Sequence, residues 1–207
     1  MAIQARETPY ATMFAETLQT CVRDLMSGLW RRDRNPGAPF HFGENHLRKQ
    51  IREFTPPPTW PRLRIERHVA GDLEEKDKKH GGVDLFFTDS CAPEDIQLQN
   101  VLATCEVGGP TRPILLRGSR ENWYPKILAD IRKQLWRAQA APGGEHFVGL
   151  MVKYSNAATV REDFYRAADS MLKETTGAVI VESSWSELPE APKLKIAILQ
   201  ILPAVTS

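Results

Sequence analysis

The sequence predicts one domain of mixed α/β class, at the boundary between α/β and α+β folds. Its 207 residues fit the usual size of about 100–200 residues per domain. A hydrophobic fraction of 42% and a charged fraction of 26% are typical of globular chains. Periodicity gives the order helix, helix, three strands, helix, strand, helix, two strands. A helix between the third and fourth strands makes those two strands parallel, so we expect a mixed sheet flanked by helices.

Two helices are predicted before the first strand. In residues 8–30 apolar residues recur every three or four positions, so this extra N-terminal helix packs one stripe on the outside of the core. The second helix runs from Glu44 to about Phe54. The proline tract TPPPTWP ends it, because proline lacks the N–H group that a helix needs. Within the single domain 1–207 we expect a core at 44–154, completed by a C-terminal helix and strands at 155–207.

The strands are predicted from alternating or continuous apolar runs between turn residues. They cover residues 62–69, 83–88, 98–107, 147–152, 178–182 and 194–202. A further helix is expected at 160–173.

The crossover helix begins between Ser119 and Lys126 and ends near Ala140, before the PGG stop. Its residues fall on two stripes at helical spacing. The apolar stripe, expected to be buried, comprises Trp123, Ile127, Ile131, Leu135 and Ala138; the polar stripe comprises Lys126, Asp130, Lys133 and Arg137.

Charge and cysteine content exclude several classes of protein. The net charge of +1 lacks the basic excess of a constitutive nucleic-acid binder, although it allows a local basic cleft. Three cysteines without a CxxC pair argue against a zinc ribbon or a disulfide scaffold, so we expect a reducing, cytoplasmic compartment. No run reaches the 18 or so apolar residues of a membrane span, and we expect no membrane association.

Two carboxylates stand in predicted strands, where burial is costly unless the acid is paired or bound to a metal. Asp84 lies in GGVDLFF and Glu106 in ATCEVGG, so a hairpin could bring both to one end of the sheet. Oxygen ligands of this kind suit Mg²⁺ or Mn²⁺, which can activate a water and neutralise charge on a phosphate. The alternative is that Asp84 caps a turn and Glu106 pairs with an arginine such as Arg112 or Arg117.

This arrangement over roughly residues 43–154 resembles the restriction-endonuclease-like PD-(D/E)XK nuclease superfamily. The resemblance implies an αβββαβ core and a Mg²⁺-dependent endonuclease that cleaves DNA by a metal-activated water. It implies that Asp84, Glu106 and the carbonyl of Val107 bind the metal. Glu44 from the helix before the strands would join them, and Glu66 is a weaker candidate.

The chain departs from the family at the lysine that follows the third-strand acid by two residues, since Gly108 stands there. Some members supply this amine from the following helix. Lys126 is therefore the leading candidate for the catalytic amine, ahead of Lys133 and Lys153. The lysine would position or deprotonate the attacking water.

The basic loop after Glu106 is the expected contact with DNA phosphates. Its candidates, together with one from the crossover helix, are Arg112, Arg117, Arg120 and Lys133. The resemblance allows a homodimer, since cutting both strands with one site per chain usually needs two copies. Two alternatives stay open: an inactive member of the same fold that binds nucleic acid or a protein, and an unrelated α/β assembly protein.

Overall fold

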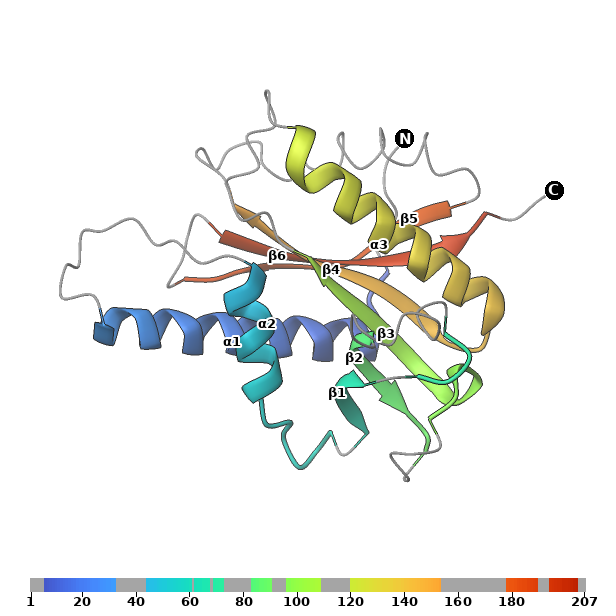
Figure 1. Cartoon of the computed structure of the whole chain (residues 1–207), viewed down its shortest axis with the longest axis horizontal. Helices are drawn as coiled ribbons and strands as arrows, with labels where there is room; N and C mark the ends of the chain where they lie inside the picture. Colours follow the sequence, from blue (N-terminus) through green and yellow to red (C-terminus); the bar gives the residue numbers. More distant parts are fainter. Residues whose placement is uncertain are drawn as a thin grey trace.

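A six-stranded mixed sheet forms the centre of the structure (Figure 1), a computed structural model. It describes residues 6–32, 44–60, 62–67, 69–72, 83–90, 96–108, 120–153, 178–189 and 194–204. The strand order is β1-β2-β3-β4-β6-β5. The strands are β1 (Leu63–Arg67), β2 (Val83–Thr88), β3 (Val101–Gly108), β4 (Glu145–Lys153), β5 (Ala178–Glu187) and β6 (Leu194–Pro203).

Only one neighbouring pair of strands in this sheet, β3 and β4, is parallel; the other four pairs are antiparallel. The parallel pair is the one joined through α3 (Arg120–Ala140), because a crossover helix returns the chain to the edge from which it left. The predicted mixed α/β class and the parallel pairing of the third and fourth strands are therefore confirmed.

Helices cover both faces of the sheet (Figure 1). α1 (Pro9–Arg32) and α2 (Glu44–Glu53) lie on one face and α3 on the other. The face under α1 and α2 is apolar: Phe14 and Leu18 of α1 and Leu47 of α2 pack in one cluster with inward side chains of β2, β3, β4 and β6. Burial of such side chains contributes about 1.5–3 kcal/mol each, so this cluster is the main core.

Most predicted element boundaries agree with the structure to within a few residues. The main differences are at strand ends: β1 is shorter than predicted, a 3₁₀ turn at Leu98–Asn100 precedes β3, and β5 extends to Glu187. The helix expected at 160–173 lies outside the described residues. Of the described helices, none is long and apolar enough to cross a membrane.

The prediction for the faces of α3 is wrong in one respect. Two members of the polar stripe, Asp130 and Arg137, are buried, whereas Leu135 of the apolar stripe is only partly buried. The buried face also includes Gln134. The helix is therefore rotated relative to the prediction, and it presents polar groups to the sheet.

Candidate acidic site between β2, β3 and α3

Arg137 is the centre of the polar contacts beneath α3. Its guanidinium is fully buried and binds two carboxylates. Nε and Nη2 donate to the two oxygens of Asp72 at 2.9 and 2.7 Å, and Nη1 donates to Oε1 of Glu106 at 2.6 Å. Such charge-assisted and bidentate contacts are stronger than neutral hydrogen bonds. Glu106 is therefore held in one orientation by a residue of the crossover helix.

A tight turn brings Asp72 to this position. The Asp72 amide donates to the carbonyl of Val69 at 3.2 Å, and Gly71 has a φ of +79°. That left-handed conformation favours glycine, because residues with a Cβ rarely adopt a positive φ. A parallel bridge between Ala70 and Gln97 holds the turn beside the start of β3. The segment thus places a carboxylate over the sheet face that α3 covers.

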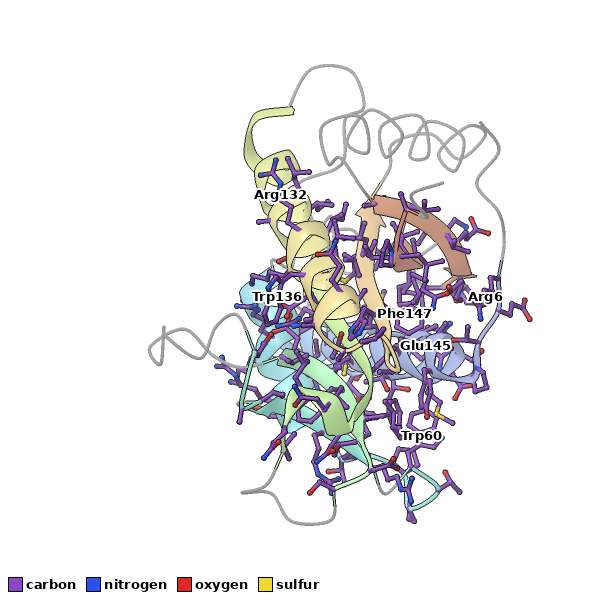
Figure 2. The ribbon with its side chains drawn as sticks, turned by 90° about the vertical axis from the view of Figure 1, so that its right-hand side faces the viewer. Arg6, Trp60, Arg132, Trp136, Glu145 and Phe147 are labelled. Atoms are coloured by element: carbon purple, nitrogen blue, oxygen red, sulfur yellow. The ribbon has the colours of Figure 1, made fainter. Side chains whose placement is uncertain are left out.

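A second set of polar contacts extends from Arg137 to β4. Nη1 of Arg137 also donates to Oε1 of Gln134 at 3.3 Å, and the Gln134 amide donates to the carbonyl of Phe147. The Thr104 hydroxyl donates to the same Gln134 oxygen at 2.8 Å and lies 2.9 Å from Nδ1 of His146. Figure 2 shows α3 lying against the sheet; the labelled Trp136 belongs to α3 and the labelled Phe147 to β4.

Asp84 lies at the other side of Glu106, near the start of β2. Its Oδ2 accepts from the amide of Val107 at 2.8 Å, and its Oδ1 accepts from Nη2 of Arg48 on α2 at 3.1 Å. The last ladder pair between β2 and β3 at this end is Leu85 with Cys105. The Asp84 carboxylate therefore serves as a side-chain acceptor for a strand amide just beyond the paired residues.

Asp84 and Glu106 are brought together, as predicted. Continuing the antiparallel register by one residue places Asp84 beside Glu106, and the Asp84 carboxylate binds the residue that directly follows Glu106. Because the N–H and C=O of one strand residue point to the same neighbour, the Val107 carbonyl also faces β2. Both acids are almost completely buried, with side chains 4% and 3% exposed.

Electrostatics of the site follow from burial and from these pairings. Burial lowers the pKa of Arg137, but the Glu106 and Asp72 carboxylates outweigh it, so its pKa is raised above the usual value. Arg137 is therefore always charged. Burial lowers the pKa of His146 to about 4, and this imidazole is neutral at pH 7. Burial also raises the pKa of Cys105 well above its usual value, with Asp84 and Glu106 adding to the effect, so this thiol is inert.

The structure places the other predicted residues as follows. Glu44 opens α2, and Arg120 and Lys126 lie in the first turns of α3, but their side chains are outside the description. Arg112, Arg117 and the side chains of Lys153 and Glu66 are also outside it. Lys133 forms an ion pair at 3.8 Å with Asp130, one turn back on the same helix.

Sequence reasoning missed the two arginines that hold the acids. The expected partners of Glu106 were in the loop that follows it, whereas its partner is Arg137 on α3. The partner of Asp84 is Arg48 on α2, whereas the alternative considered from the sequence was that Asp84 caps a turn. The sequence does contain a pattern that indicates burial of Arg137. Gln134 and Arg137 follow Ile127 of the apolar stripe at successive spacings of seven and three residues, which places all three on one face of the helix.

Comparisons with family models, with curated proteins and with solved structures find no match. Within the described part of the chain, no three His, Cys, Asp or Glu side chains form a metal-binding group. That part includes Asp84 and Glu106 but not the side chains of Glu44 and Glu66. The function of the site is therefore argued from its chemistry and geometry.

Proposed function

We propose that the protein is a metal-dependent nuclease that hydrolyses phosphodiester bonds of DNA, with Asp84 and Glu106 as ligands of Mg²⁺ or Mn²⁺. One observation carries the proposal: two buried carboxylates stand side by side on β2 and β3, joined through the Val107 amide. The order α2, β1–β3, α3, β4 is the order of elements that the resemblance to PD-(D/E)XK nucleases implies.

The residues present fit a hard divalent cation. The donors are two carboxylates and the carbonyl of Val107, and oxygen is the ligand that Mg²⁺ and Mn²⁺ prefer. Glu106 uses Oε1 for Arg137, and its Oε2 takes part in no hydrogen bond between described residues. That oxygen is the ligand we assign to Glu106. Asp84 would contribute Oδ1, the oxygen that Arg48 now binds at 3.1 Å.

The chain's own residues prepare this site before any ion binds. The Val107 amide orients Asp84, and the buried Arg137 orients Glu106. A cation held there would lower the pKa of water and neutralise charge developing on a phosphate. We assign the missing amine to Lys126, with Glu44 as an additional acid, and phosphate contacts to the arginines that follow β3. Held ligands avoid the cost of reorganisation during the reaction.

Cleavage of a supercoiled plasmid and of a duplex oligonucleotide under Mg²⁺ or Mn²⁺ tests the proposal. Asp84→Asn and Glu106→Gln remove a ligand charge at nearly constant volume, and each is expected to lower the cleavage rate by more than about 100-fold. Asp89→Asn is the matched control, because Asp89 is an exposed acid just after β2 that pairs with Arg62. Equal rates in the wild type and both site variants would refute the assignment.

A second function is favoured by a different observation. Both acids already have arginine partners, and Gly108 stands where the resemblance expects lysine. An inactive member of the same fold would keep these pairs as structural contacts and use the sheet to bind nucleic acid or a protein. It would bind DNA equally well with and without Mn²⁺ and would cleave none. A Mn²⁺ affinity that depends on Glu106 excludes this second function.

A further inference from the structure

Arg48 and Arg137 bind neighbouring acids, but they are held very differently. Arg137 is 0% exposed and donates to Asp72, Glu106 and Gln134 from three different nitrogens. The side chain of Arg48 is 34% exposed, and its contact with Asp84 runs through Nη2 alone. Moving Arg137 would take the counter-charge from two buried carboxylates at once. Arg48 already reaches water, and Asp84 keeps the Val107 amide as a donor when Arg48 turns outward. Of the two, Arg48 is the one that can leave its carboxylate.

We propose that Arg48 is an exchangeable cation of the site: it neutralises Asp84 until a divalent cation binds, and it then contacts a DNA phosphate. This inference rests on the proposed nuclease function and names the regulation of its metal site. Metal binding and DNA binding are thereby coupled through one side chain. Each ligand favours the state of Arg48 that the other requires, which makes their binding mutually reinforcing.

The charges of the site support an exchange. Arg48 brings one positive charge to the buried carboxylate of Asp84, and a divalent cation brings two. An ion that takes the place of Arg48 beside Asp84 and Glu106 therefore keeps these buried carboxylates compensated.

The position of Arg48 suits a phosphate once it has turned outward. Lys49 and Arg52 on the same short helix are exposed. A guanidinium matches the paired oxygens of a phosphate as it matches those of a carboxylate. The released side chain therefore has a ligand of the same geometry at the surface where a backbone would approach the acids.

Titration calorimetry with Mn²⁺ on the whole protein, without DNA, tests the first half of the exchange. Arg48→Met removes the competing charge and keeps much of the side-chain volume, and it is expected to bind Mn²⁺ about 10-fold more tightly than the wild type. Lys49→Met is the matched control, since Lys49 is exposed on the same helix and pairs with Glu53 rather than with the site. It is expected to leave Mn²⁺ affinity unchanged.

The second half is tested by repeating the titration with a cleavage-resistant phosphorothioate duplex. The duplex is expected to raise the Mn²⁺ affinity of the wild type several-fold and to leave that of Arg48→Met nearly unchanged. If the wild type binds Mn²⁺ but Arg48→Met binds it with equal affinity, the exchange is wrong and the nuclease proposal stands. If the wild type binds no Mn²⁺, the nuclease proposal itself fails and the exchange fails with it.

Discussion

Arg137→Met is expected to destabilise the protein strongly, although the residue lies on a helix stripe that is polar in sequence. Methionine fits the space of the aliphatic part but leaves Asp72 and Glu106 buried without their counter-charge. Removing one partner of a buried ion pair costs about 3–5 kcal/mol, and here one guanidinium serves two carboxylates. Because a domain of this size is stable by about 5–15 kcal/mol, this loss is a large fraction of the total.

A compensating variant separates a charge effect from a packing effect. Asp72→Asn and Glu106→Gln remove the two buried charges at nearly constant volume, so adding both to Arg137→Met is expected to recover part of the lost stability. Urea unfolding followed by circular dichroism measures the free energy of unfolding of the wild type, of Arg137→Met and of this triple variant.

The matched control is Lys133→Met on the same helix. Its ion pair with Asp130 is 3.8 Å long and the lysine side chain is about one third exposed, so the expected loss is below about 1 kcal/mol. An Arg137→Met variant within about 1 kcal/mol of the wild type, or a triple variant no more stable than Arg137→Met, would show that the buried ion pairs do not stabilise the fold.

Three further predictions concern the core and its titratable groups. Gly149→Ala is expected to lower the free energy of unfolding in urea by about 1–3 kcal/mol, because its Cβ would lie 2.9 Å from Cδ1 of Leu18. Gly143→Ala is the neutral control, since a Cβ there would meet nothing within 4 Å. His146, with its pKa lowered to about 4 by burial, binds a proton less readily when folded than the unfolded chain does, so the protein loses stability as pH falls from about 6.5 toward 4. A titration near 6.5 of the NMR signals assigned to the His146 imidazole in the folded protein would contradict this. The Cys105 thiol is fully buried and its pKa is raised, so we expect it to resist iodoacetamide at pH 8 until urea unfolds the chain. Mass spectrometry of the peptide that contains Cys105 measures the labelling. Rapid labelling of the folded protein would contradict this prediction.

Local patterns predict the elements of this fold well. The apolar spacing in residues 8–30, the proline tract after α2 and the alternation in β1 are each set by neighbours in the chain. The crossover rule then gives the parallel pairing of β3 and β4 from element order alone. The neighbouring positions of Asp84 and Glu106 follow from the same reasoning, because a hairpin fixes which residues face each other.

The partners of these acids could not be predicted in the same way. Asp72 and Arg137 are 65 residues apart, and Asp72 begins a charged run that reads as a solvated loop. A polar residue on a helix normally faces water, and the sequence places Arg137 on the polar stripe of its helix. Its burial is favourable only because two distant carboxylates meet it there, and spacing within a helix carries no information about them.

Anomalous scattering from a crystal soaked with Mn²⁺ shows whether Asp84 and Glu106 bind a metal ion. We expect one peak bounded by Oδ1 of Asp84 and Oε2 of Glu106, with Arg48 turned away from Asp84 and Arg137 still on Glu106. No peak at millimolar Mn²⁺, with both arginines in their present contacts, would contradict the claim that these two acids form a metal site.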